Sequence, residues 1–387
     1  MRIALICTEK LPVPPVAGGA VQLYIEGIVP YLAAHHEVTV FCIHHPELPA
    51  KEERDGVKYI RISATSKNGY VAKIKPYLKD NFDLIYVFNR PQWVLTLSEG
   101  LSNNVRFGLS LHNEMFHEEK ITDEQALECV NRVDFINTVS KFIADGIKTR
   151  VPCAEGKLNV IYSGANIGAY EPLGSDAALK NKKILLEKYG LIGYKVILYV
   201  GRLSVKKGVD ILLKAVKSVM DFNDDVALVI VGSKWYGKNE KDDYTASLEV
   251  LSKKLKGPIV FTGFLPPSEI PLHYNIGDIF VCASQWNEPL ARVHYEAMAA
   301  GLPIITTSRG GNAEVVEKGI NGLVLDDKSY NNPERMAEYI NYLLDNPQIA
   351  AQLGKNGRRL AVKHYNWERV ANNVLDVLSR PYDRGQQ

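Results

Sequence analysis

The sequence lacks any stretch of about 18 consecutive apolar residues, the length that a membrane-spanning helix needs. It also lacks a strong charge of either sign, because 46 lysines and arginines face 44 acids and leave a net charge of +2. No global field therefore indicates nucleic acid as a partner. The opening residues, MRIALICTEKLPVPP, hold an apolar run far too short for a signal peptide. We therefore expect a cytoplasmic enzyme or binding protein.

Cysteine is scarce, with five residues at spacings unlike those of a metal site. Three of them, Cys7, Cys42 and Cys282, end apolar runs of the β type, which predicts buried free thiols in a reducing compartment. Internal repeats and low-complexity tracts are absent as well. With 46% hydrophobic and 23% charged residues, the 387-residue chain has the composition of a globular protein and is long enough for two domains.

The sequence does contain a regular alternation of short β-branched runs with helical segments. Nearly continuous apolar strands between helices indicate parallel sheets covered on both faces. The alternation runs through two series of domain size, joined in the weakly periodic stretch 164–181, so we predict an α/β fold with two doubly wound domains. Ligands bind at the carboxyl ends of such strands, and two facing sheets would form a cleft. The predicted strands are 2–7, 37–43, 57–62, 83–88, 105–110, 134–138 and 158–162, then 195–201, 225–232, 258–263, 278–283, 302–307 and 322–326.

The segment VGRLSVKKGVDILLKAV (200–216) predicts an anion site. A strand ends at Gly201, a basic turn with Arg202, Lys206 and Lys207 follows, and a helix begins near Gly208. Unpaired N–H groups at the helix N-terminus and the neighbouring cations suit a diphosphate. The segment has neither G-x-G-x-x-G nor G-K-[ST], so it is not a nicotinamide or Walker-type loop. A solvated basic loop is the alternative.

The segment EPLARVHYEAMAAG (288–301) places Glu288 and Glu296 eight residues apart. With Pro289 as the first helical residue, a helix over about 290–300 would separate the two acids by roughly 12 Å along its axis. That length suits a sugar–diphosphate–ribose ligand, with N–H groups near 290–292 serving the phosphates. A surface helix with two solvated acids is the alternative.

Three further features follow predicted strands. The pair Gly18 and Gly19 opens a helix, and such a loop lets backbone approach a phosphate closely, although glycine pairs also make ordinary turns. Gly310 and Gly311 repeat the arrangement. His112 lies just past an apolar strand, where a histidine is either structural or part of a site.

Several segments match, in order, the motifs of one known family. EPLARVHYE matches its E-x7-E element, EAMAAGLPII the segment that follows it, and GRLSVKKG its GRLxxxKG element. Residues 18–38 resemble its amino-terminal GGxxxxxxxLxxxLxxxGHEV pattern, and 139–142 and 160–166 match more loosely. The chain therefore resembles the GT-B glycosyltransferases of family 4, a large retaining group, over essentially its whole length. Its EPLARVHYEAMAAG wording is most similar to the spore-coat-type branch.

The resemblance implies a role for each matched residue. Arg202 and Lys207 would bind the diphosphate, Glu288 would orient the donor sugar, and Glu296 would bind the ribose hydroxyls. With His112, which matches a histidine of the family's catalytic cleft, Glu288, Arg202 and Lys207 form the expected catalytic set.

The expected donor site also includes the residues beside the sugar and the first glycine pair. The family's usual EPFG is here EPLA followed by arginine, so the donor sugar is expected to be unusual. These further donor-binding residues are Gly18, Gly19, Leu290, Ala291 and Arg292.

The implied activity is transfer of a sugar from a nucleotide-diphosphate donor, with uridine the first choice of base, to an acceptor hydroxyl with retention of configuration. Residues 1–167 would bind the acceptor, 168–365 the donor, and a helix in 366–387 would pack back on the first domain. The D-x-D triplet of metal-dependent nucleotide-sugar enzymes is absent, so we expect no metal and no cofactor. The acceptor could be a glycan, a lipid-linked molecule or a small molecule in cell-envelope, polysaccharide or spore-coat glycan synthesis.

Several alternatives remain open. A phosphorylase or an epimerase would share the fold, and a non-catalytic spore-coat protein could bind the nucleotide sugar without turnover. Between residues 58 and 79 the first domain carries six basic residues and no acid, which could contact an anionic membrane surface or a charged acceptor, with a solvated face as the alternative. These residues are Lys58, Arg61, Lys67, Lys73, Lys75 and Lys79.

Overall fold

The computed structural model describes residues 1–79, 81–234 and 242–380, and it divides the chain into two compact units. Unit 1 comprises Met1–Ser163 and Trp367–Gln387, and unit 2 comprises Gly164–Asn366. The division falls after Ser163 and not after 167. Its physical reason is that Ala165 belongs with the end of unit 2, because its N–H donates to the carbonyl of Tyr365 at 2.9 Å.

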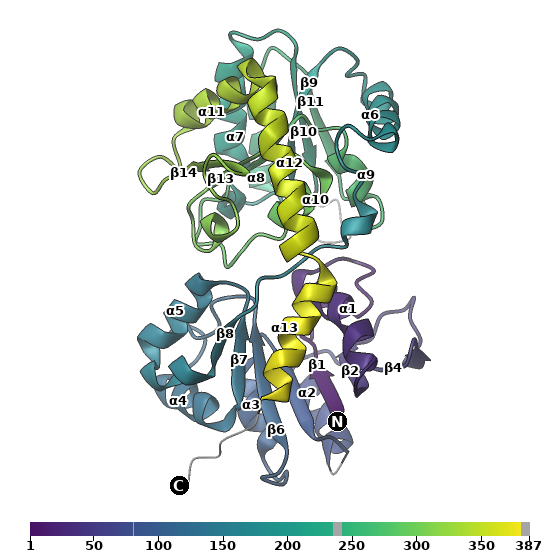
Figure 1. The fold of residues 1–387 in the computed structure, drawn as a ribbon. Helices are drawn as coiled ribbons and strands as arrows, with labels where there is room; N and C mark the ends of the chain where they lie inside the picture. The colour runs from purple at the N-terminus through teal and green to yellow at the C-terminus, as the bar shows by residue number, and fades with distance from the viewer. Residues whose placement is uncertain (80, 235–241, 381–387) are drawn as a thin grey trace. The chain divides into compact units, whose positions relative to one another are not determined.

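Unit 1 is built on an eight-stranded sheet with the order β3-β4-β2-β1-β5-β6-β7-β8 (Figure 1). All neighbours are parallel except β3 and β4, which pair antiparallel. The central run, in which strand order reverses beside β1, is the doubly wound arrangement. The strands are β1 Arg2–Ile6, β2 Glu37–Ile43, β3 Lys51–Arg54, β4 Val57–Ile62, β5 Leu84–Phe88, β6 Arg106–Leu111, β7 Phe135–Thr138 and β8 Leu158–Val160.

Helices cover both faces of this sheet, as the apolar strands require. Among the described residues the α-helices of unit 1 are α1 Ala20–Ala33, α2 Lys67–Leu78, α3 Pro91–Ser98, α4 Asp123–Arg132, α5 Lys141–Arg150 and α13 Trp367–Ser379. The last of these comes from the far end of the chain and packs beside α1 (Figure 1). The part of the predicted helix at 381–387 lies outside the described residues.

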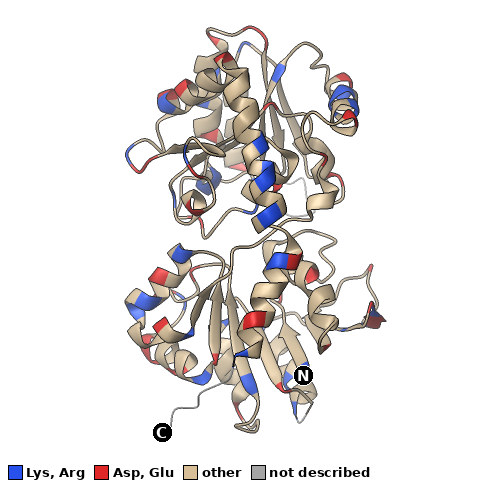
Figure 2. Ribbon diagram, viewed as in Figure 1, with Lys and Arg blue, Asp and Glu red and all other residues tan. Residues whose placement is uncertain are grey.

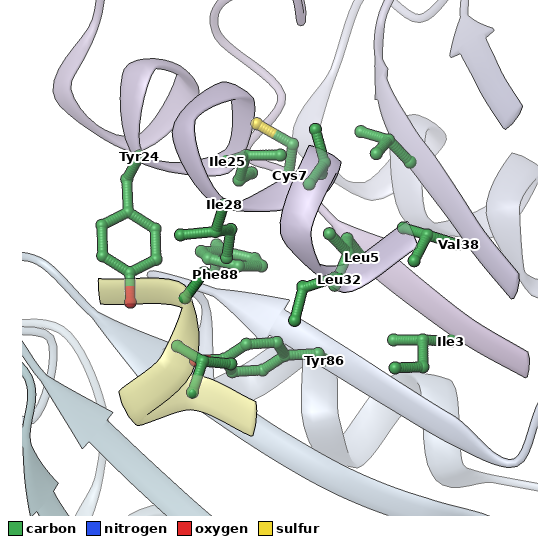
Figure 3. Packing of buried hydrophobic residues seen from close by; sticks show 14 of the residues in the cluster. Ile3, Leu5, Cys7, Tyr24, Ile25, Ile28, Leu32, Val38, Tyr86 and Phe88 are labelled. Atoms are coloured by element: carbon green, nitrogen blue, oxygen red, sulfur yellow. The ribbon is translucent and has the colours of Figure 1, made fainter. Parts of the chain in front are cut away.

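The core of unit 1 joins β1, α1 and α13 in one apolar cluster (Figure 3). Ile3 and Leu5 of β1, Ile28 of α1 and Val374 of α13 are all fully buried within it. Gly27 allows the two helices to approach, because a Cβ at this position would lie 2.2 Å from the indole ring of Trp367.

Unit 2 is built on a six-stranded, fully parallel sheet with the order β11-β10-β9-β12-β13-β14. Two doubly wound sheets confirm the predicted α/β class. The strands are β9 Lys195–Val200, β10 Val226–Val231, β11 Ile259–Gly263, β12 Ile279–Cys282, β13 Ile304–Thr307 and β14 Gly322–Leu325, and the described α-helices are α6 Asp176–Tyr189, α7 Val209–Met220, α8 Asp243–Ser252, α9 Ile270–Tyr274, α10 Val293–Ala300, α11 Pro333–Asp345 and α12 Pro347–His364.

The predicted thiols are confirmed. Cys7, Cys42 and Cys282 are free and buried. Charges of both signs are mixed over the helices of each unit (Figure 2), in keeping with the small net charge.

Candidate active site

The basic turn of unit 2 lies between β9 and α7, as the sequence predicts. A short 3-10 turn, Val205–Lys207, follows the strand, and α7 begins at Val209 with Gly208 as its N-cap. Gly208 has a φ of 66°, and a Cβ there would lie 2.1 Å from the carbonyl oxygen of Ala283. The turn therefore packs directly against the chain that leaves β12, which brings Lys207 to the segment containing Glu288.

Lys207 and Glu288 form a tight ion pair, with 2.5 Å between Nζ and Oε2. Their side chains are only 18% and 9% exposed, so water screens the pair weakly. Two more donors reach the same oxygen of Glu288, the indole N–H of Trp286 at 2.8 Å and the hydroxyl of Ser284 at 3.1 Å. All three donors occupy Oε2, and among the described residues Oε1 has no hydrogen-bond partner.

These contacts set the charge of Glu288. Burial alone would raise the pKa of its carboxyl group, but the charge of Lys207 and the hydrogen bonds from Lys207, Trp286 and Ser284 outweigh burial and lower the pKa below its ordinary value. Glu288 is therefore a carboxylate at neutral pH, with one oxygen saturated and the other able to accept from a ligand.

The loop that follows β13 holds the backbone of Glu288. Gly310 has a φ of 60°, and a Cβ at this position would lie 2.1 Å from the carbonyl oxygen of Glu288. The N–H of Gly311 donates to the same carbonyl at 2.8 Å. The second glycine pair thus packs against the protein's own backbone, a contact that its sequence pattern does not reveal.

The predicted helix over 290–300 is wrong at its start, because α10 begins at Val293. The side-chain oxygen of Asn312 accepts from the N–H of Ala291 at 3.2 Å, which satisfies that group outside a helix. Ala291 N–H is therefore already bonded, contrary to the expectation that it faces the diphosphate. Glu288 precedes α10, so the axial spacing of roughly 12 Å to Glu296 does not apply. Leu290 and Ala291 are buried.

Glu296, in the first turn of α10, is also buried and strongly held. The hydroxyl of Tyr274 donates to its Oε2 at 2.8 Å, and Arg292 lies 3.6 Å from its Oε1. Burial first, and then the charge of Glu296, raise the pKa of Tyr274 well above its ordinary value, so Tyr274 remains a donor. Arg292 also donates to the carbonyl of Gly164 at 3.0 Å.

Arg202 lies half-buried in the loop after β9, and its carbonyl accepts from the hydroxyl of Tyr199 at 3.0 Å. Unit 2 therefore brings Lys207 and Glu288 into contact and places Arg202 on the same loop as Lys207. It also pairs Arg292, the N-cap of α10, with Glu296 in the first turn of that helix.

The remaining predicted site residues belong to unit 1. His112 is 8% exposed and follows β6, with its Nε2 3.1 Å from the hydroxyl of Ser110. Its backbone N–H donates to Oδ1 of Asn89 at 2.7 Å. Gly18 and Gly19 have φ values of 86° and 107°, and Gly19 caps α1.

Sequence reasoning missed the residues that hold the predicted ones. Ser284, Trp286 and Asn312 contact the Glu288–Ala291 segment, and Tyr274 contacts Glu296. The sequence did contain a signal for Ser284 and Trp286. Polar residues between the end of β12 and Glu288 have no apolar core in which to pack. Asn312 and Tyr274 carry no such local signal, because other segments bring them to the site, the turn after β13 for Asn312 and the end of α9 for Tyr274.

The predicted basic surface at 58–79 is wrong for Arg61. Its side chain is fully buried, donates to the carbonyls of Val13 and Pro49, and pairs with Glu52 at 2.6 Å. Lys75 pairs with Glu99 at 2.9 Å. None of the helices in the described residues is long and apolar enough to cross a membrane.

Each unit contains a doubly wound sheet. In unit 2, a cation, a buried carboxylate and the start of a helix lie together after the strands. These are the features of a GT-B glycosyltransferase. A family model described as Glycosyltransferase Family 4 matches residues 17–168, and one described as Glycosyl transferases group 1 matches residues 182–360. The chain is 45% identical to Spore coat protein SA of Bacillus subtilis, covering 98% of this chain and all of that protein. The chain therefore belongs to glycosyltransferase family 4, and it is a transferase of the spore-coat type.

Two other proteins extend the comparison. YtcC of Bacillus subtilis is 43% identical over 97% of this chain and 91% of its own length. The crystal structure of HepE from Anabaena in complex with UDP and glucose superposes with a TM-score of 0.76 at 21% identity, covering 98% of this chain and 100% of that one. At that identity the likeness shows the fold alone.

Proposed function

We propose that this glycosyltransferase moves a sugar from a UDP-linked donor to an acceptor hydroxyl with retention of configuration, in cell-envelope, polysaccharide or spore-coat glycan synthesis, and that it needs no metal. The contact between Lys207 and Glu288 carries the proposal, because it joins a cation that can bind phosphate to a carboxylate that has one free oxygen. The UDP bound to HepE supports the choice of base.

The open Oε1 of Glu288 would accept a hydrogen bond from a hydroxyl of the donor sugar. Its negative charge would also stabilise the positive charge that develops at the anomeric carbon. The bond from this carbon to the diphosphate oxygen breaks as the acceptor oxygen attacks from the same face. The leaving phosphate oxygen takes the acceptor's proton, so atoms and charge balance.

The charge that builds on the leaving diphosphate needs stabilisation in place. Lys207 can turn one ammonium hydrogen to Glu288 and another to a phosphate, and Arg202 lies on the same loop. Preorganised cations of this kind supply electrostatic stabilisation without a metal ion. Glu296, held by Tyr274 and Arg292, would bind the ribose hydroxyls. Unit 2 is the donor-binding unit and unit 1, with His112, the acceptor-binding unit.

Thermal unfolding with UDP, GDP, ADP and their common sugars, with and without EDTA, tests the donor and the metal independence together. A ligand present at about 100 times its Kd adds about 2.7 kcal/mol to stability, which gives a clear rise in melting temperature. We expect UDP and a UDP-sugar to raise it equally with and without EDTA. A rise in melting temperature that EDTA abolishes would contradict metal independence. A rise with GDP alone would replace uridine by guanosine as the base of the donor.

Replacing Arg202 by alanine is expected to weaken UDP binding about tenfold or more, because a charge-assisted hydrogen bond to phosphate is lost. Titration calorimetry with UDP and with uridine measures the effect. Uridine, which has no phosphate, should bind both proteins equally. Equal UDP affinity in the two proteins would contradict the phosphate role of Arg202.

A structural role in the spore coat is a second candidate, favoured by the 45% identity to Spore coat protein SA. Complementation of coat assembly by a Glu288→Gln variant distinguishes the two. Full rescue by a variant without turnover would favour the structural role.

A further inference from the structure

Four charged side chains gather at the carboxyl edge of the sheet in unit 1. Glu9 and Lys10 follow β1, Arg90 follows β5, and Lys67 opens α2. The guanidinium of Arg90 binds both oxygens of Glu9, with distances of 3.0 Å from Nε and 2.8 Å from Nη2. The one acid of this group is therefore already matched by one cation, and Lys10 and Lys67 add two further positive charges.

Asn89 holds part of this group in place by hydrogen bonds. This residue has a φ of 54°, a left-handed conformation that is uncommon for a residue other than glycine. Its carbonyl accepts from Nη1 of Arg90 at 2.8 Å, while its side-chain oxygen accepts from the N–H of His112 at 2.7 Å. One residue thus holds both Arg90 and the expected catalytic histidine, so Arg90 and His112 lie at the same edge of the unit 1 sheet.

Around Lys67, the described part of the chain supplies two further cations, Arg90 and Lys10, and one acid, Glu9. Burial first, and then the charges of Arg90 and Lys10, lower the pKa of Lys67, and only Glu9 acts in the opposite direction. Neither α2 nor α3 has an acid in its first turn. Nζ of Lys67 lies 3.5 Å from the side-chain oxygen of Gln92, which is long for a hydrogen bond. An anion bound here would relieve the repulsion between the cations.

We propose that Lys67, Arg90 and Lys10 form an anion subsite for the acceptor, so that the hydroxyl acceptor of this transferase carries a carboxylate or phosphate group. The inference rests on the proposed function, because it assigns the acceptor to unit 1. It adds the chemical class of that acceptor, a charged sugar or sugar phosphate. Other basic residues of α2 do not fit the role, since Lys75 is paired with Glu99 and Lys73 donates to the carbonyl of Ser63.

Saturation-transfer NMR on the full-length protein tests the subsite with glucose, glucose 6-phosphate and glucuronate as probes. We expect at least one charged sugar to bind about fivefold or more tightly than glucose, because the exposed cations Lys10 and Lys67 act on it. Lys67→Gln should remove most of that preference, and Lys10→Gln should reduce it. Lys75→Gln, on the same helix but outside the cluster, is the matched control and should bind as the original protein does.

Three results would overturn the proposal. One is equal binding of glucose and both charged sugars. Another is inorganic phosphate binding as tightly as glucose 6-phosphate, which would make the cluster a plain ion site. The last is a result with lipid vesicles. If Lys67→Gln no longer co-sediments with phosphatidylglycerol vesicles, behaves as the original protein does with phosphatidylcholine vesicles, and binds sugars unchanged, the cluster would be assigned to a membrane surface.

The same variants separate this inference from the proposed function. UDP should stabilise Lys67→Gln as much as the original protein, because the nucleotide site belongs to unit 2. Absence of any UDP effect alongside an intact preference for charged sugars would contradict the donor assignment and leave the anion subsite in place.

Discussion

Replacing Glu288 by glutamine is expected to lower kcat about 10²–10³-fold while leaving UDP affinity nearly unchanged, because the lost charge acts mainly in the transition state. The amide oxygen of glutamine can take the place of Oε2 and still accept from Lys207, Trp286 and Ser284. Its NH₂ group then occupies the position of Oε1, where a sugar hydroxyl needs an acceptor. The variant should therefore fold, with a loss of stability from the unpaired charge of Lys207, and fail in turnover.

Steady-state release of UDP from the donor chosen by thermal unfolding measures the effect. Glu187→Gln, an exposed acid in the same unit, is the matched control and should retain full activity. A Glu288→Gln enzyme with unchanged kcat would remove Glu288 from the reaction and with it the proposed use of the open oxygen.

Replacing Lys207 by methionine is expected to destabilise unit 2 by about 3 kcal/mol, because removing one partner of a buried ion pair leaves the other charge uncompensated. The side-chain exposures of 18% and 9% justify treating the pair as largely buried. Chemical denaturation at pH 7 measures the loss. The double variant Lys207→Met, Glu288→Gln removes both charges and should recover most of the stability.

The stability of the Lys207→Met variant should depend on pH with a definite sign. With Lys207 present, the lowered pKa of Glu288 contributes stability above the unfolded value, and this is lost as pH falls through the folded pKa. Without Lys207, burial dominates and raises the pKa, so the folded variant binds a proton more readily than the unfolded chain. The stability difference between the two proteins should therefore be largest near pH 7 and narrow toward pH 4. A difference that is independent of pH would show that Glu288 is not the affected group.

Local sequence patterns predicted the sheets well, because a buried parallel strand must be apolar along its whole length. Every predicted strand is present in order. The strand at 51–54 was missed, since its sequence KEER has no apolar face and this edge strand pairs only with β4. Its existence depends on tertiary contact, which propensity does not record.

The site was predictable where a motif places a charged residue whose chemistry suits a ligand. A lysine and a carboxylate in separate motifs were both singled out, but their contact at 2.5 Å could not be predicted across a sequence separation of 81. The start of α10 was missed because Asn312 and the glycine pair hold Glu288 to Ala291 outside the helix. Arg61 was taken as a surface cation because its sequence neighbours are basic, although the carbonyl of Val13, 48 residues earlier, binds it in the interior.

The interrupted sequence of unit 1 has a consequence for how the molecule is made. Its core includes Val370, Ala371 and Val374 of α13. Gly27 of α1, which has no side chain, leaves room for the indole ring of Trp367. During synthesis, domains generally fold as units from the N-terminus onward. Here the first unit to leave the ribosome has no α13 to close its core until the last residues are made. Unit 2, which is continuous over 164–366, can complete its fold first although it is translated second.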